Sequence, residues 1–153
     1  MTAIASRLAE LGIELPEPAA PVAAYVPTVL VGNLLHISGQ VSIENGALLT
    51  GRLGEDRDLD FGVRAARACG LMLLAQIERA VGLERVERMV KLGVFVNSAA
   101  SFTDQPKVAN GASELMQDVF GETGRHARSA VGVPVLPLGA AVEIDAVVQV
   151  KAG

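Results

Sequence analysis

The sequence predicts a two-layer α+β domain, in which two long helices cover one face of a mixed β-sheet. Its 153 residues are enough for one domain. Half of them are apolar and only 20% are charged, so the chain can bury a core and is not disordered as a whole. After a short N-terminal helix, the pattern of apolar residues runs strand, strand, helix, strand, helix, strand, strand. Two helices with one apolar face each suit one side of a sheet.

An N-terminal helix and a proline-rich connector precede the main domain. Residues 3–11 form a short amphipathic helix, and Gly12 stands where a helix C-terminus is expected. Three prolines then make residues 14–22 extended, because proline cannot continue a helix and favours extended geometry in the residue before it. We therefore divide the chain into residues 1–21 and a domain over residues 22–153.

The domain begins with two strands, which are followed by loops and a long helix. Residues 29–31 and 34–38 are apolar runs around a glycine and an asparagine, a pattern typical of strands joined by a tight turn. Glycine is frequent over 39–57, which predicts loops with one short strand. From Asp58 the apolar residues recur at helical spacing until Gly82, which predicts a long helix.

A third strand and a second long helix come next. The β-branched run over 84–96 predicts a strand. Thr103 or Asp104 can cap the following helix, which has Pro106 in its first turn. One apolar stripe continues from there to Gly121, where the helix is expected to stop.

The last two strands, 127–133 and 141–150, are expected to pair as a hairpin. Alternation along the final strand predicts that one set of side chains faces the helices: Val142, Ile144, Ala146, Val148 and Val150. The other set lies on the opposite face of the sheet: Glu143, Asp145, Val147 and Gln149. Because that face is half polar and half apolar, it suits a subunit interface better than open solvent.

Composition excludes several classes of function. Thirteen Lys and Arg against seventeen Asp and Glu give a net charge of −4, whereas proteins that bind phosphate backbones usually have a basic surplus. Cys69 is the single cysteine, and His36 and His126 lack the spacing of a metal site. We expect no metal, no organic cofactor and no nucleic-acid partner. No signal peptide or membrane span is apparent, so we expect a soluble, cytoplasmic protein without a membrane partner.

The main candidate for chemistry is an arginine in the strand 127–133. Arg128 stands between small residues in an apolar strand, where a buried guanidinium requires an anion. If the last two strands form a hairpin, Glu143 falls within about one register step of Arg128. The two residues then form either a salt bridge without chemistry or a site in which Arg128 binds a substrate carboxylate. In the second case Glu143 orients or deprotonates a water.

Three further side chains have weaker signals. His126 precedes Arg128 by two residues and is a candidate for the lining of the same cleft. Cys69 lies in the middle of a predicted helix, which indicates a buried, inert thiol. His36 lies on a predicted strand, where it is structural or exposed.

Several segments share their order and spacing with one known family: Tyr25, Ile37-Ser38-Gly39-Gln40, Ala127-Arg128-Ser129-Ala130-Val131, Leu136-Pro137 and Val142-Glu143-Ile144. The sequence thereby resembles, over residues 22–150, the YjgF-like Rid family of reactive-intermediate (enamine/imine) deaminases. These proteins are also described as L-PSP endoribonucleases or translation inhibitors. The resemblance implies a chorismate-mutase-like fold and a homotrimer whose sheets form a central barrel, with three clefts between subunits.

The resemblance also implies roles for five residues. In that family, the arginine that matches Arg128 holds the carboxylate of a 2-imino acid. The glutamate that matches Glu143 helps to place the attacking water. Tyr25 matches a tyrosine near the entrance of the cleft, and Ser38 and Gly39 match small cleft-lining residues.

Other positions near the expected cleft either contribute backbone groups or differ from the family. Backbone groups near Ser129 and Ala130 are placed to accept hydrogen bonds from the departing nitrogen. Ala130 also stands where the family commonly has a cysteine. An asparagine that the family often has in its second long helix falls nearest Ser113, with Asn110 one turn earlier, and the sequence does not choose between them.

The implied activity is the hydrolytic deamination of enamine or imine intermediates, namely 2-imino acids, to 2-keto acids and ammonia. An imine already hydrolyses in water, so the protein needs mainly to fix the substrate carboxylate and present a water. The first alternative is a non-catalytic, small-molecule-binding or chaperone-like trimer that uses the same clefts. An endoribonuclease is a further alternative, against which the acidic net charge argues.

Overall fold

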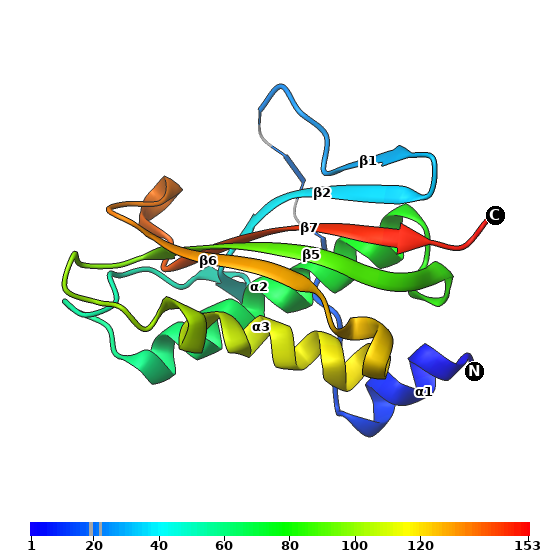
Figure 1. Ribbon diagram of the computed structural model, residues 1–153, viewed down its shortest axis with the longest axis horizontal. Coiled ribbons are helices and arrows are strands. Elements are labelled where there is room, and N and C mark those ends of the chain that lie inside the picture. Colours follow the sequence, from blue (N-terminus) through cyan, green and yellow to red (C-terminus); the bar gives the residue numbers. More distant parts are fainter. Residues whose placement is uncertain (19, 22) are drawn as a thin grey trace.

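The computed structural model describes residues 1–18, 20–21 and 23–153. Ala19 and Val22, which the sequence analysis assigns to the connector and its boundary with the domain, lie outside the described residues. A five-stranded mixed sheet packs against two long helices (Figure 1), which confirms the predicted two-layer α+β architecture.

The elements follow the predicted order along the chain. The helices and 3-10 turns of the described residues are α1 (Ala3–Glu10), α2 (Leu59–Ala80), η1 (Leu83–Arg85), α3 (Gln105–Phe120), η2 (Gly121–Gly124) and η3 (Pro137–Gly139). The strands are β1 (Thr28–Val31), β2 (Leu34–Val41), β3 (Ile43–Glu44), β4 (Ala47–Leu48), β5 (Val86–Asn97), β6 (Ala127–Val133) and β7 (Val142–Val150). Within the segment predicted as loops with one short strand, the structure has the end of β2 and a small β3–β4 hairpin.

Local sequence signals explain where the long helices begin and end. The carboxylate of Asp58 accepts a hydrogen bond of 2.9 Å from the backbone N–H of Phe61 and so caps α2. Asp104 occupies the N-cap position of α3, as one of the two predicted alternatives, but its side chain makes no capping hydrogen bond. Gly121 ends α3 with a φ of 65°, a conformation that glycine adopts without strain.

The strand order differs from the sequence prediction in one respect. The sheet runs β1-β2-β7-β5-β6, and β6 pairs in parallel with β5 rather than with β7. The predicted hairpin between residues 127–133 and 141–150 is therefore wrong. Its physical reason is the helix α3 between β5 and β6, because a helical crossover is the connection that two parallel neighbours need.

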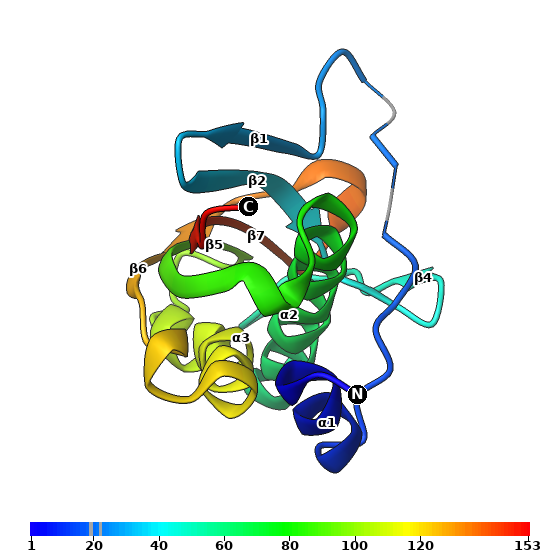
Figure 2. The same cartoon turned by 90° about the vertical axis from the view of Figure 1, so that its right-hand side faces the viewer.

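The two faces of the sheet differ as the alternation in β7 predicts. Every second residue from Val142 to Val150 is buried against the helices, and the residues between them lie partly or fully exposed on the other face, here called the open face. Figure 2 shows α2 and α3 on one side of the sheet only. The open face also presents several exposed apolar side chains: Val29, Val31, Leu34 and Val131.

Small residues allow α2 and α3 to pack closely. A methyl group at Gly111 on α3 would collide with the backbone carbonyl of Val63 on α2. Gly70 on α2 similarly faces Ala112 and Leu115 on α3. These contacts fix the height of α3 beneath β6, where the candidate site lies.

The N-terminal helix α1 docks on the same body. Its first turn is held by a hydrogen bond of 2.8 Å from the backbone N–H of Ile4 to the Glu84 carboxylate. Arg7 Nε donates to the Asp118 carbonyl at 2.7 Å, which connects α1 to α3. The side chains of Ile4 and Leu8 pack against the hydrophobic core.

Candidate functional site

Arg128 lies on the edge strand β6, and its side chain reaches under the sheet to α3. Its Nη1 donates to Asn110 Oδ1 at 2.8 Å and to Ser113 Oγ at 3.1 Å. Both partners are neutral, and among the described residues no carboxylate forms an ion pair with Arg128. Within that same part of the chain, nothing accepts a hydrogen bond from its Nε or Nη2. The guanidinium therefore keeps donors for an external anion.

The two alternatives for the family asparagine both contact this arginine. Asn110 and Ser113 lie three residues apart on α3, on adjacent turns of one helix face. Each accepts from the same Nη1, so the arginine is held from two points on one rigid element.

His126 completes the cluster around Arg128. Its Nδ1 lies 2.7 Å from the Gly124 carbonyl oxygen, and its Nε2 lies 2.8 Å from Ser113 Oγ. A carbonyl can only accept, so Nδ1 carries the proton, and Nε2 of the neutral ring accepts from the Ser113 hydroxyl. The hydroxyl oxygen in turn accepts from Arg128, which has only donors. The directions of all these hydrogen bonds are thus fixed.

Electrostatics favour the neutral form of this histidine. Burial lowers the pKa of His126, the hydrogen bond to the Gly124 carbonyl opposes that shift, and the nearby Arg128 charge lowers the pKa further. The net direction is below the usual value, so the ring is neutral at pH 7 and its Nε2 is a proton acceptor.

Glu143 lies far from Arg128 within one chain. Across β5, Arg128 stands level with Leu92 and Ala146, whereas Glu143 stands level with Phe95. Two strand spacings and three residues along the strands separate the two Cα atoms by about 14 Å. Their side chains also lie on opposite faces of the sheet, because Glu143 belongs to the open face. The predicted contact between these residues is therefore wrong for a single chain, because it depended on the hairpin.

A second group of predicted residues surrounds Glu143. Gly39 on β2 lies against the Glu143 carboxylate, and any side chain at this position would collide with it. Ser38 donates its hydroxyl to the Val26 carbonyl at 2.8 Å and so fixes the segment ahead of β1. Tyr25 lies in that segment, is 52% exposed, and shares with Gly39 the lining of a small hollow of about 50 Å³.

The environment of Glu143 makes its carboxylate more basic. Burial raises the pKa of Glu143, and the negative charge of Asp145 two residues further along β7 raises it again. No described residue on or near β2 and β7 donates a hydrogen bond to this carboxylate. It is thus a half-buried acceptor that is available to a ligand or a water.

Ser129 and Ala130 divide between the two faces of β6. Ala130 faces the helices and packs against the core, on the same side as Arg128. Ser129 is exposed and points to the open face. Of the predicted site residues, Arg128, His126 and Ala130 therefore form one group with α3, and Tyr25, Ser38, Gly39 and Glu143 form another.

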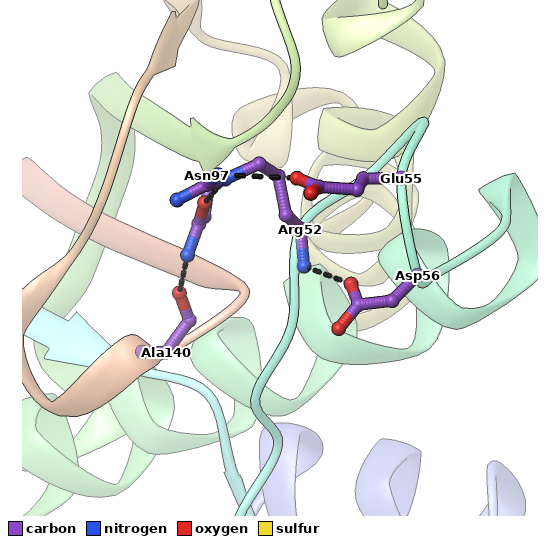
Figure 3. A network of polar contacts seen from close by, with 5 residues as sticks. All are labelled: Arg52, Glu55, Asp56, Asn97 and Ala140. Carbon is purple, nitrogen blue, oxygen red and sulfur yellow. Dashed lines mark hydrogen bonds and ion pairs between the residues drawn. The ribbon is translucent and has the colours of Figure 1, made fainter.

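A polar network secures the start of β7, close to Glu143 (Figure 3). The buried Asn97 donates from its amide to the Ala140 carbonyl at 3.1 Å and accepts from Arg52 Nε at 3.2 Å. Arg52 also pairs with Glu55, and its backbone N–H donates to Asp56. Because these contacts join the loop at Arg52 to the end of β5 and to the start of β7, we interpret this network as structural support for the strand that carries Glu143.

Two other candidates have no part in either group. Cys69 is fully buried in α2, where burial raises the pKa of its thiol well above the usual value. His36 is exposed on the open face of β2. Among residues 1–18, 20–21 and 23–153, no three His, Cys, Asp or Glu side chains gather as metal ligands, and no helix is long and apolar enough to cross a membrane.

Sequence reasoning named the separate members of the Arg128 cluster but missed the bond between Ser113 and His126. The feature that explains this hydrogen bond is the short η2 turn, which begins at Gly121 and brings residue 126 back to α3. The fold and this cluster define a two-layer α+β protein with a half-buried arginine, held by neutral partners, at one edge of its sheet.

Comparisons with known proteins agree with this class. Residues 5–148 match the family described as YjgF/chorismate mutase-like, putative endoribonuclease. The chain belongs to this family, which confirms the resemblance identified from the sequence. The solved structure of protein Atu1372 from Agrobacterium tumefaciens is 46% identical, with a TM-score of 0.90 over 97% of this chain and 92% of that chain.

Two curated relatives cover almost the whole chain. Protein TCP17 of Trypanosoma cruzi is 53% identical over 151 residues, which are 97% of this chain and 94% of TCP17. A 2-iminobutanoate/2-iminopropanoate deaminase of Dermatophagoides farinae is 28% identical, over 91% of this chain and 95% of the mite protein.

Proposed function

We propose that this protein hydrolyses 2-imino acids, or their enamine tautomers, to 2-keto acids and ammonia, with Arg128 binding the substrate carboxylate. The observation that carries the proposal is the state of that guanidinium. It is half-buried and oriented from α3 by two neutral acceptors, and no described residue accepts a hydrogen bond from its Nε or Nη2. A planar guanidinium with two free donors suits bidentate recognition of a carboxylate.

The neutral partners of Arg128 distinguish it from a structural ion pair. The ion pairs of the described residues join exposed or half-exposed side chains, such as Arg64 with Glu44 at 2.6 Å. At Arg128, by contrast, no acidic side chain of the described residues compensates the positive charge. A partly desolvated cation of this kind is stabilised when an anion binds, so binding energy is available for the substrate.

The relatives support the chemical class of the substrate. The mite protein named 2-iminobutanoate/2-iminopropanoate deaminase aligns with 91% of this chain. A 2-imino acid carries the carboxylate that Arg128 would bind next to the carbon that water attacks.

We propose that the two groups of site residues meet between copies of the chain. Arg128 lies on the edge strand β6, and Tyr25 lies just ahead of the opposite edge strand β1. A closed ring of identical copies that meet head to tail brings one edge of each sheet to the other edge of its neighbour. In a homotrimer of this kind, each cleft would contain Arg128 of one copy and Glu143 of the next.

In such a cleft, Glu143 would accept a hydrogen bond from the attacking water. Its raised pKa makes the carboxylate a stronger acceptor than an exposed glutamate. Tyr25, Ser38 and Gly39 would line the entrance and leave room for the substrate, and backbone groups near Ser129 and Ala130 would bind the departing nitrogen. An imine already hydrolyses in water without a catalyst, so the proposed reaction requires neither a metal nor an organic cofactor.

The test is the lifetime of an imine made in solution. An amino-acid oxidase generates 2-imino acids from amino acids, and semicarbazide traps whatever has not hydrolysed. The wild-type protein should reduce the semicarbazone yield, and Arg128→Ala should not. An unchanged yield with the wild-type protein would overturn the proposal.

Two further measurements, of carboxylate binding and of RNA cleavage, separate the alternatives. Binding of a carboxylate at Arg128 without any effect on imine lifetime would indicate a small-molecule-binding protein. Cleavage of RNA, lost at high salt, would instead support the endoribonuclease activity in the family description.

A further inference from the structure

We propose that His126, acting through the hydroxyl of Ser113, accepts and returns the proton that is transferred at the Arg128 site. This inference rests on the proposed imine hydrolysis and adds a proton relay to it. Within the family chemistry described above, nothing assigns that role to His126 or to Ser113.

The geometry of the relay is a directed line of hydrogen bonds. Arg128 Nη1 donates to Ser113 Oγ at 3.1 Å, Ser113 donates to His126 Nε2 at 2.8 Å, and His126 Nδ1 donates to the Gly124 carbonyl at 2.7 Å. Ser113 Oγ has two lone pairs, of which Arg128 occupies one. No further described residue donates to Ser113 Oγ, so the second lone pair can accept a hydrogen bond from a water or from a substrate N–H.

The protein fixes His126 in the tautomer that the relay needs. Ser113 and His126 are thirteen residues apart and are brought together by the η2 turn. Gly124 in this turn packs directly on the Met116 carbonyl of α3, where any side chain would collide with the backbone. The turn therefore holds the Gly124 carbonyl against Nδ1, in the way that a third group orients the base of a catalytic pair.

The charges around the histidine favour a neutral proton acceptor. Arg128 on β6 is the charged group that acts on His126, and it disfavours the imidazolium form. The other contacts are the Ser113 hydroxyl from α3 and the Gly124 carbonyl from η2, which are both neutral. Substrate carboxylate bound at Arg128 compensates its charge, and the imidazolium then becomes easier to form during the reaction.

Both halves of the hydrolysis use the relay, and the atoms balance. The reacting substrate is the protonated imine, C=NH2⁺: the oxygen of water bonds to its carbon, and the C=N π pair moves to nitrogen, which becomes a neutral amine. The water proton passes to Ser113 Oγ while the Ser113 proton passes to His126 Nε2. The proton then returns from His126 through Ser113 to the amine nitrogen. The C–N bond breaks as the hydroxyl becomes the ketone, and the departing ammonia takes the hydroxyl proton to leave as ammonium.

The test compares variants in the imine-lifetime assay across pH. His126→Gln keeps a polar side chain but removes the basic ring nitrogen that accepts the proton. Ser113→Ala removes the hydroxyl through which the proton passes. Each should lower kcat by about 10²–10⁴-fold, the usual contribution of general acid–base catalysis, with little change in KM. Thr123→Val is the matched control, because among the described residues its hydroxyl bonds to the Phe120 carbonyl at the end of α3 and not to Arg128, Ser113 or His126. This variant should keep the wild-type rate.

Two readouts separate a proton relay from a merely structural role. The wild-type kcat should fall at acidic pH at the same midpoint as the NMR titration of His126, and this limb should be absent in His126→Gln. In His126→Gly, added imidazole should restore part of the rate. Thermal unfolding of each variant identifies any loss that comes from misfolding.

The outcomes distinguish this inference from the proposed function. If Arg128→Ala is inactive while His126→Gln and Ser113→Ala keep the wild-type kcat and pH profile, the relay is wrong and the deaminase proposal stands. If folded His126→Gly is inactive and imidazole does not restore it, the histidine is structural and the relay is again overturned. If the wild-type protein leaves imine lifetimes unchanged, both proposals fail.

Discussion

Arg128 on β6 and Asn110 on α3 are joined by a hydrogen bond of 2.8 Å, which holds at the edge of the sheet a guanidinium that forms no ion pair with any described carboxylate. The amide of Asn110 is neutral. It therefore orients the guanidinium without compensating its positive charge, which remains available to an anionic ligand.

The first prediction concerns the geometry of that charge. Arg128→Lys keeps the positive charge but loses the planar fork, and a charge-assisted hydrogen bond is worth about 1.5–3 kcal/mol. We expect affinity for a carboxylate such as pyruvate to fall about 10–100-fold, as measured by calorimetry. Arg128→Ala should lose binding and remain folded. If it unfolds instead, the arginine is a structural residue.

The second prediction concerns the state of His126. Two-bond ¹H–¹⁵N NMR spectra should show the Nδ1–H tautomer at pH 7, because Nδ1 faces a carbonyl. The ring should titrate below the usual histidine range, since burial and Arg128 lower its pKa. The second histidine, His36, is exposed on β2, so its signals in the same spectra must be assigned separately. An Nε2–H tautomer at His126 would contradict the hydrogen-bond directions given above.

The third prediction relates Glu143 to stability. The pKa of this carboxyl is raised on folding, so its contribution to stability is present below the unfolded value of 4.5 and is lost as pH rises through the folded value. At pH 7 the charged group therefore opposes folding. We expect Glu143→Gln to increase the free energy of unfolding in urea at pH 7, with no gain at pH 4 or below. Glu114→Gln, at an exposed position of α3, is the control. A loss of stability at pH 7 would refute this assignment.

The fourth prediction is that Cys69 does not react in the native protein. Its thiol is buried, its Sγ donates to the Val142 carbonyl at 3.4 Å, and burial raises its pKa. If exposure requires an opening of about 4 kcal/mol, alkylation by iodoacetamide should be about 10³-fold slower than in denaturant. Because the chain has one cysteine, mass spectrometry reports this site alone. Equal rates in both states would show that α2 opens readily.

The fifth prediction concerns the contact between the long helices. Gly→Ala in a helix ordinarily stabilises by about 1 kcal/mol. Gly111→Ala should instead destabilise by about 1–3 kcal/mol, because its methyl group meets the rigid Val63 carbonyl. Gly70→Ala is the matched comparison, since the nearest atom there is the end of the flexible Leu115 side chain at 2.9 Å. Urea unfolding of the two variants should therefore show the larger loss for Gly111→Ala.

The helices and the faces of the sheet could be predicted from the sequence because local signals specify them. Asp58 and Gly121 mark helix ends, and strict alternation from Val142 onward identifies the buried face. Strand order could not be predicted in the same way, because the short segment between β6 and β7 resembles a hairpin connection. The helix between β5 and β6 was the signal for parallel pairing. It outweighs the proximity of the last two strands in the sequence.

The sequence predicted which residues belong to the candidate site, but it did not predict how they are arranged in space. Arg128 and Glu143 were identified by a charged group in an apolar strand and by family resemblance, but alternation in β6 alone does not tell which face the arginine takes. Its contact with α3 settles that, and only the fold shows that Ser113 lies between Arg128 and His126.

Arg128 lies on the edge strand β6 and Glu143 on the central strand β7, and this separation within one chain has a genetic consequence. If one copy supplies the arginine and its neighbour supplies the glutamate of each cleft, two inactive variants can complement each other in a mixed oligomer. Random mixing of Arg128→Ala chains with Glu143→Gln chains would leave about a quarter of the clefts with both native side chains. A cell that carries both loss-of-function alleles would then retain partial activity, whereas a cell that carries only one of them would have none.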